Sequence, residues 1–358
     1  MSQLSSKHLI FIISALAIVS IKTYPTIFTK LSGRDTWIAL LTASFFIFLY
    51  LIYILWICKK KNCFDFGLIY ERALGKFFGN IFLILFLLTI FLTTVESSSV
   101  EASAMHNGFL FQTKTWQLLL LSVPVAIYIV HSGYDAVLNT VLIGIFFIAI
   151  SGMVLFLLTK NYKDYSQLSP ILEHGFNLQF FNSVIKLIGA YSSIAIFLPL
   201  LKYVRDIKNI SKFSLFGFLF VTQLQVVSML GTLATFEIDI LNSMCYPKLV
   251  QTQLIRQANF LDAGQLFVML QIVGGWIIKL TLTLYVITKI LERFKLNKPL
   301  HLYILGILIY FSACFASSNI FILFKLLDVF VYIEFVNFIV LPLMIFTIFL
   351  FRGNNKVS

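Results

Sequence analysis

Long runs of apolar residues divide this chain into about ten segments, each near the roughly 20 residues that a helix needs to cross a bilayer. The runs lack the alternation of apolar and polar residues that a membrane barrel strand requires, so we predict that all of them are helices. The expected spans are 8–28, 37–58, 79–100, 116–131, 136–158, 181–203, 213–236, 263–290, 302–316 and 331–351.

The first apolar segment is interrupted by Lys22-Thr23-Tyr24-Pro25. A cation, a hydroxyl and a proline stand here where lipid would favour leucine, and proline cannot continue a helical ladder. We therefore predict that the first membrane helix is broken, as in transporter-type membrane folds.

Composition agrees with an integral membrane protein. Of the 358 residues 59% are hydrophobic and only 12% are charged, and the mean hydropathy is +0.94. These values exclude a soluble domain of this size. We expect a single transmembrane domain over residues 1–358, with recognition inside or just outside the bilayer.

Positive charge gathers on one side of the expected bundle. The chain has 27 Lys and Arg residues against 15 Asp and Glu, a formal net charge of +12. If the N-terminus is cytoplasmic, most basic residues fall in cytoplasmic segments, so we expect both termini on that side. This basic face suits anionic membrane lipid and needs no nucleic-acid partner. The apolar run continues past Ala15-Leu16-Ala17, so we expect a retained span rather than a cleaved signal.

Patterns of catalysis or metal binding are missing from the sequence. The four cysteines form no CxxC pair, and the five histidines fall near span ends and loops. Paired carboxylates, a Ser/His/Asp set and a Gly-rich phosphate loop are not found. We therefore predict no cofactor, no metal site and no enzymatic activity.

Charged residues inside spans are the first functional candidates, because each costs about 3 kcal/mol at mid-helix. At about 1.5 Å per residue, Lys22 lies roughly 20 Å and Glu96 roughly 24 Å from the same membrane boundary. One interpretation joins them as a latch or polar ligand cradle. In the other, Lys22 extends to the outer surface once Pro25 ends the helix.

The third span ends in Glu96-Ser97-Ser98-Ser99-Val100-Glu101, which is too polar to face lipid. It either lines a water-filled vestibule or is the end of a helix that enters solvent. In the sixth span, Gly189-Ala190-Tyr191-Ser192-Ser193 combines small size with hydroxyls and suits a second helix break. The glycine there also suits plain helix packing.

The eighth span carries a polar stripe on an otherwise apolar helix: Gln271, Gly275, Lys279 and Thr283 follow each other at i,i+4 spacing. Packing alone cannot explain a lysine on such a helix, so Lys279 must point into the bundle. In the last loop and span, Lys325 and Asp328 are spaced to pair with each other. We place these two and Glu334 at the mouth or surface.

Several motifs follow each other along the chain: Tyr24-Pro25-Thr26, Gly33-Arg34-Asp35-Thr36-Trp37-Ile38, Phe197-Leu198-Pro199-Leu200-Leu201, and Tyr246-Pro247 through Phe260-Leu261-Asp262-Ala263. Together with its length and span count, these make the chain resemble the spore germination protein family of the GerAB type over essentially its whole length.

The resemblance implies an all-α membrane fold of leucine-transporter type, with two inverted five-helix repeats at about 8–158 and 181–351 and with helices 1 and 6 discontinuous. It implies the B subunit of a nutrient germinant receptor, within the amino acid, polyamine and organocation transporter superfamily. The location would be the spore inner membrane, with both termini on the spore core side. The partners would be a small nutrient, often an amino acid, and the A and C subunits of the receptor.

Position in that fold implies a ligand site between the two breaks and the third span, formed by Val19, Ser20, Lys22, Thr93, Glu96, Ser97, Gly189, Ala190, Tyr191, Ser192 and Ser193. Lys22, Glu96 and Lys279 would act as buried or gating charges. An alternative function is an amino acid permease that moves substrate by alternating access, which an uptake assay would separate from a receptor.

The chain departs from the family pattern at two places. Many members have a Gly-Val-Gly break before the proline, where this chain has Ile18-Val19-Ser20. Because β-branched residues resist glycine-like conformations, a backbone nest for a carboxylate is less favoured, and Lys22 would supply the anion recognition instead. The second departure is Asn259-Phe260-Leu261, where acidic and basic residues are usual.

Overall fold

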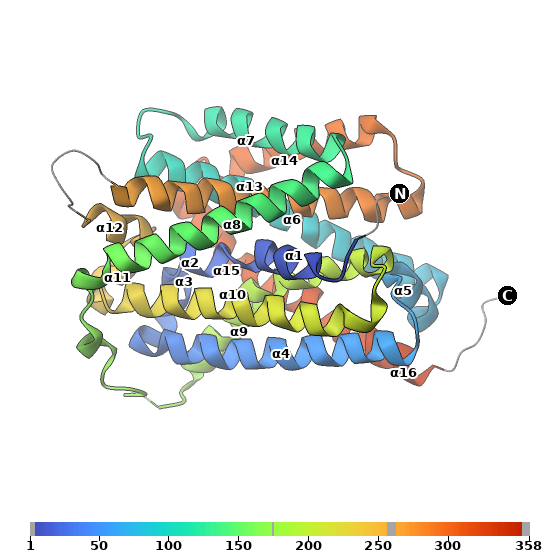
Figure 1. Cartoon of the computed structure of the whole chain (residues 1–358), viewed down its shortest axis with the longest axis horizontal. Coiled ribbons are helices and arrows are strands. Elements are labelled where there is room, and N and C mark those ends of the chain that lie inside the picture. Colours follow the sequence, from blue (N-terminus) through green and yellow to red (C-terminus); the bar gives the residue numbers. More distant parts are fainter. Residues whose placement is uncertain (1–3, 174, 256–262, 353–358) are drawn as a thin grey trace.

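The computed structural model describes residues 4–173, 175–255 and 263–352, and its regular structure is helical (Figure 1). The motif residues 259–262 lie outside the described residues. The first half contains α1 His8–Ala17, α2 Ser20–Thr23, α3 Thr26–Ser32, α4 Thr36–Lys60, α5 Phe66–Leu74, α6 Lys76–Gly108, α7 Thr115–His131 and α8 Tyr134–Leu158. The second half contains α9 Leu178–Ser192, η4 Ser193–Tyr203, α10 Ile210–Leu233, α11 Ile238–Ser243, α12 Pro247–Gln253, α13 Ala263–Leu291, α14 Pro299–Ala316, α15 Ile320–Glu334, η7 Phe335–Val340 and α16 Leu341–Phe351.

The helices match the expected membrane spans. Within the described ranges, eight helical segments are long and apolar enough to cross a bilayer, and His8–Thr23 and Thr115–His131 are shorter apolar ones. The tenth span was predicted to begin too late, because the helix covers Ile320–Phe351 rather than 331–351. Lys325 and Asp328 interrupt the apolar run there and concealed the start of the helix.

The long helices α6 and α13 lie side by side along the bundle, and α8 packs against α13 (Figure 1). Helix α1 packs against α10, α4 against α9 and α10, and α14 against α7. We call the end of the bundle where α1 begins and α13 ends the N-terminal face. The other end, which holds α11 and α12, is the opposite face.

Helix 1 is interrupted, as predicted, but at two places rather than one. Two residues separate α1 from α2, and Pro25, which has no amide hydrogen, separates α2 from α3. Near the first break, side chains donate to backbone carbonyls: Gln225 Nε2 to Ala17 at 2.6 Å and Ser193 Oγ to Leu16 at 3.0 Å. Side chains of α10 and η4 thereby satisfy backbone groups that hydrocarbon could not hydrate.

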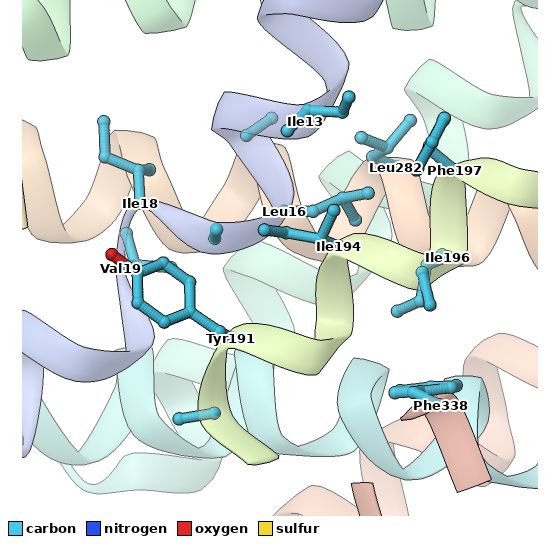
Figure 2. Close-up of a cluster of buried hydrophobic side chains, with 14 of the residues drawn as sticks. Ile13, Leu16, Ile18, Val19, Tyr191, Ile194, Ile196, Phe197, Leu282 and Phe338 are labelled. Atoms are coloured by element: carbon cyan, nitrogen blue, oxygen red, sulfur yellow. The ribbon is translucent and has the colours of Figure 1, made fainter. Parts of the chain in front are cut away.

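Helix 6 is also irregular, as predicted. The α-helical geometry of α9 ends at Ser192, and the tighter 3-10 geometry of η4 continues through Pro199 to Tyr203. Ile194 and Phe197 of η4 are buried with residues of α1 and α13, Leu282 among them (Figure 2). The breaks of helices 1 and 6 therefore lie in the centre of the protein.

The tenth span contains a π-helical segment, η7, that the sequence did not predict. Pro342 has no amide hydrogen to donate to the carbonyl of Phe338 four residues earlier. The hydroxyl of Tyr50 on α4 donates to that carbonyl instead, at 2.9 Å. Asn337 in the same segment donates to Thr89 of α6 at 2.8 Å. These bonds fasten the irregular part of the last span to the bundle.

Gly189 marks a close approach between α9 and α15. A Cβ atom added there would overlap the carbonyl group of Val331, whereas one added at Gly274 on α13 would have its nearest neighbour, Ile148, at 4.0 Å. Backbone contact of this kind is the common use of small residues between membrane helices. Gly189 therefore has a packing role, whatever its part in ligand binding.

We predict that Gly189→Ala lowers the midpoint of thermal unfolding in detergent, because α9 and α15 must separate to admit the methyl group. The matched control is Gly274→Ala, which adds the same methyl group in open space and should be neutral or slightly stabilising by helix propensity. The two variants can be compared by fluorescence-detected size exclusion after heating. Equal midpoints for the two variants would contradict the packing role.

Candidate binding site at the break of helix 1

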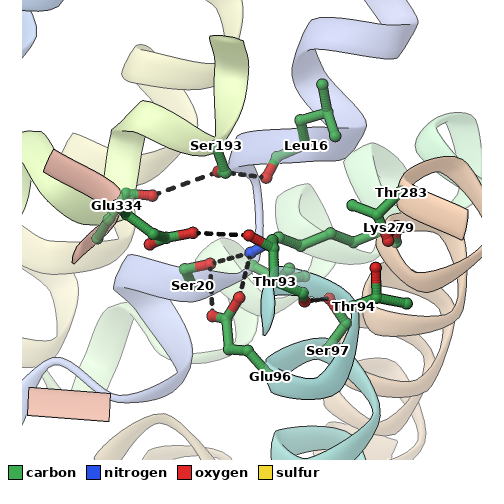
Figure 3. A network of polar contacts seen from close by, with 12 residues as sticks. Leu16, Ser20, Thr93, Thr94, Glu96, Ser97, Ser193, Lys279, Thr283 and Glu334 are labelled. Carbon is green, nitrogen blue, oxygen red and sulfur yellow. Dashed lines mark hydrogen bonds and ion pairs between the residues drawn. The ribbon is translucent and has the colours of Figure 1, made fainter. Parts of the chain in front are cut away.

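A buried ion pair lies beside the break of helix 1 (Figure 3). Lys279 Nζ on α13 is 2.8 Å from Glu96 Oε2 on α6 and donates to Ser20 Oγ on α2 at 2.7 Å. Ser20 Oγ in turn donates to Glu96 Oε1 at 3.2 Å. The side chain of Lys279 is 0% exposed and that of Glu96 is 2% exposed. One ammonium group thus links three elements in the middle of the bundle.

Aromatic residues complete the surroundings of the pair. The hydroxyl of Tyr24 donates to Glu96 Oε1 at 2.6 Å, so this carboxylate accepts hydrogen bonds at both oxygens. Lys279 Nζ lies 5.2 Å from the ring centre of Trp276, which stacks on Tyr24 with centroids 6.4 Å apart. Such partners make it possible to keep a charged pair out of water. Tyr24 belongs to the network because it follows Ser20 by one helical turn.

A second carboxyl group lies close to the first. Glu334 on α15 is 1% exposed, and Thr93 Oγ1 on α6 donates to its Oε1 at 3.1 Å. The prediction that Glu334 lies at the mouth or surface is therefore wrong, because α15 starts eleven residues before the expected span and carries Glu334 into the interior. Among the described residues no cation forms an ion pair with Glu334. The cluster has one cation and two carboxyl groups, so a proton or a ligand cation would complete its charge.

Lys22 does not join this cluster. Its ammonium group donates to Gln271 Oε1 on α13 at 3.3 Å, and Glu96 pairs with Lys279 instead. Helical geometry explains the difference, since residues two apart in α2 point about 200° apart. When Ser20 faces Glu96, Lys22 must face away from it. Of the two interpretations of Lys22, the pair with Glu96 is excluded.

The expected pair between Lys325 and Asp328 is also wrong. Asp328 Oδ1 lies 2.5 Å from Lys186 Nζ on α9, and Lys325 is exposed. The side chain of Lys186 is only 7% exposed, so it has the greater need of a counter-ion in a membrane. Lys325 can reach the surface and needs none.

The other predicted ligand residues are buried around the two breaks: Val19, Ser20, Thr93, Ser97, Gly189, Ala190, Tyr191, Ser192 and Ser193. The hydroxyls of Ser97, Ser192 and Ser193 donate to backbone carbonyls of the protein itself. Figure 2 shows the ring of Tyr191 directed toward Val19. The side chain of Val19 also covers Gly275 on α13, where an added Cβ would overlap it. The predicted ligand position is thus closed and filled by the protein.

Open space lies on both sides of this closed centre. On the N-terminal face, a cavity of about 470 Å³ lies between α1, α8, η4 and α13 and is lined by Tyr134, Tyr203 and Tyr285 among others. On the opposite face, a cavity of about 60 Å³ contains Lys22 and Gln271. Sequence reasoning missed the three tyrosines because they come from different elements and share no local pattern.

The arrangement of the helices places this protein in a known fold class. A solved structure of a Na⁺-coupled sialic acid symporter, in a substrate-bound outward-open state, is similar with a TM-score of 0.66 and 11% identity, over 94% of this chain and 79% of the symporter chain. This chain therefore has the leucine-transporter fold, with two inverted five-helix repeats and discontinuous helices 1 and 6.

The family is shown by sequence. The family described as "Spore germination protein" matches residues 3–322, so this chain belongs to the spore germination protein family. No curated protein matches the chain. The resemblance expected from the sequence motifs is confirmed.

We predict that Lys279→Met and Glu96→Gln each destabilise the protein, Lys279→Met by about 3–5 kcal/mol because it leaves a buried carboxylate unpaired. The double variant should recover much of this loss, since the carboxylate that Lys279→Met leaves unpaired is then a neutral amide. The measurement is the unfolding midpoint of each variant in detergent, arranged as a double-mutant cycle. Lys325→Met, which removes an exposed lysine, serves as the control and should change little. Additive losses in the double variant would exclude the coupling.

Proposed function

We propose that this protein is the B subunit of a spore nutrient germinant receptor, which binds a small nutrient and starts germination. The nutrient class that fits the charges best is an amino acid. Membership of the spore germination family and the transporter fold support this proposal. The observation that carries it is the ammonium group of Lys279, bound to Ser20 and Glu96 beside the break of helix 1.

A covalently held cation suits a receptor better than an ion-coupled pump. An exchangeable coupling ion must enter and leave its site in each transport cycle, but Lys279 remains attached to α13. Its hydrogen bonds hold α2, α6 and α13 together without any ion from solution. A ligand that disturbs these bonds changes the packing of three elements, which is the kind of two-state response that a receptor needs.

Glu334 and Lys22 together offer charges complementary to a zwitterion. Glu334 carries a carboxyl group that forms no ion pair with a cation among the described residues, and Lys22 carries an ammonium group bonded to a neutral amide. An amino acid would place its ammonium group toward Glu334 and its carboxylate toward Lys22. Since Val19 and Tyr191 fill the predicted ligand position, binding there requires the two helix breaks to separate. Binding and movement are coupled for that reason.

The expected location is the spore inner membrane, with A and C subunits of the receptor as partners and both termini on the spore core side. Basic residues favour this orientation, because Lys59, Lys61, Lys202 and Arg293 all lie toward the N-terminal face. In this orientation the nutrient arrives at the opposite face.

The second candidate function is an amino acid permease. It is favoured by the cavity of about 470 Å³ on the N-terminal face, which lies between α1, α8, η4 and α13. Alternating access requires such a cavity on one side while the other side is closed.

The deciding experiment uses spores that lack this gene, exposed singly to amino acids, sugars and salts. We expect dipicolinic acid release to be lost for one nutrient class, while uptake of that nutrient by growing cells stays normal. Normal germination together with reduced uptake would refute the receptor and establish the permease.

We also predict that Lys22→Met weakens the nutrient response without lowering the protein level, because the ligand loses a cation partner. The control is Lys325→Met, on an exposed surface. Dipicolinic acid release is measured against nutrient concentration, and the protein level by immunoblot of spore membranes. A dose response unchanged by Lys22→Met would refute the role of Lys22.

A further inference from the structure

Three lysines meet at the small cavity of the opposite face. Lys22 comes from α2, Lys163 from the segment after η2 Lys160–Tyr162, and Lys248 from α12. The cavity of about 60 Å³ is completed by neutral side chains of α8, α10 and α13, such as Ser228 and Gln271. None of its described lining residues is acidic. Three ammonium groups therefore face one space in which the described residues provide no counter-ion.

Each lysine is bonded only to neutral groups in the described structure. Lys22 donates to Gln271 Oε1 at 3.3 Å, and Lys248 donates to Gln251 Oε1 at 2.7 Å. Lys163 donates to the carbonyl of Phe156 at 3.4 Å and lies 4.3 Å from the ring centre of the same residue. These contacts hold the ammonium groups in place but do not neutralise them.

The nearest acid in sequence is turned away. Asp164 follows Lys163 directly, but its Oδ1 accepts hydrogen bonds from the amide and the hydroxyl of Ser166, at 3.0 and 2.7 Å. It therefore caps the start of η3 Tyr165–Leu168 and is not among the residues that line the cavity. Like charges that share a half-buried cavity repel each other more than in open water, because less water screens them.

The electrostatics of Lys248 reflect this crowding. Burial, and then the neighbouring charges of Lys163 and Lys22, lower the pKa of Lys248 to about 7. Burial also lowers the pKa of Lys163. An anion in the cavity would favour the charged form of all three amines, so the site and the anion stabilise each other.

We propose that Lys22, Lys163 and Lys248 form an anion-binding site on the opposite face, which takes a small monovalent anion such as a carboxylate group or chloride. The cavity of about 60 Å³ is far smaller than the cavity of about 470 Å³ on the N-terminal face. We therefore expect it to take a small anion or a carboxylate group rather than a whole nutrient. Lys22 lies in the same short helix as Ser20, so an anion here acts directly on the element that contacts the central ion pair.

This site is independent of the identity of the nutrient and can be tested without spores. The full-length protein in detergent is heated in sodium acetate, sodium chloride or sodium gluconate at equal ionic strength. We expect acetate or chloride to raise the unfolding midpoint relative to gluconate, whose anion is too large for the cavity. Binding to the native state alone produces such a rise. Acetate acting alone assigns the site to carboxylates, and chloride acting alone assigns it to inorganic anions.

The variants Lys163→Gln and Lys248→Gln keep polar side chains at the cavity and remove one charge each. Each should weaken the anion affinity by about tenfold or more, the value of one charge-assisted hydrogen bond. Lys325→Gln is the matched control on an exposed lysine. The line width of the chloride NMR signal gives a second readout that does not depend on stability. Equal midpoints in all three salts, or no loss of anion response in the cavity variants, would overturn the proposal.

The pH dependence provides a specific signature. Lys22 and Lys163 face Lys248 from α2 and the loop, while the cavity side chains of α10 and α13 are neutral. Because Lys248 has a pKa of about 7, it is charged below that pH and neutral above it. Anion affinity should therefore fall as the pH rises from 6 to 8, and Lys248→Gln should flatten this fall. A dependence on pH that Lys248→Gln leaves unchanged would contradict the role of Lys248.

Discussion

The ion pair between Lys279 and Glu96 is the constraint on which the centre of this structure depends. A charge in hydrocarbon must be paired and fully hydrogen-bonded, and here Lys279 on α13 meets Glu96 directly on the adjacent helix α6. Ser20 and Tyr24, which lie at the two ends of α2 between the breaks of helix 1, complete the hydrogen bonds of the pair. The buried charges therefore hold the interrupted part of helix 1 against α6 and α13.

The same principle governs the uncharged breaks. Interruptions of this kind free backbone carbonyls that lipid cannot hydrate, and at two of them side chains from other elements donate hydrogen bonds to the carbonyls. Gln225 and Ser193 serve the break of helix 1, and Tyr50 serves the π-helical segment before Pro342. These irregular segments are stabilised by polar side chains that lie on neighbouring elements at the same depth in the bundle.

The sequence was sufficient for the spans, the broken helices 1 and 6 and the burial of Lys279, because these depend on local patterns of apolar, polar and proline residues. It was insufficient for pairing. Glu334 and Asp328 lie in a segment whose charges concealed the start of the last helix. Their partners, Thr93 and Lys186, could therefore not be predicted from the sequence. The direction of Lys22 depends on the exact rotation of the short helix α2, which no periodicity in the sequence records.

The position of the charges agrees with the receptor function that we propose. Lys279 is neutralised within the protein, whereas Lys22 has a neutral partner and faces the cavity of the opposite face. A zwitterion or anion arriving there meets a cation on α2 before it meets the filled space at Val19. The binding free energy gained at Lys22 acts on α2, the short helix that also holds Ser20 against Glu96. Recognition at the surface and the packing of the core are therefore joined through four residues of one short helix.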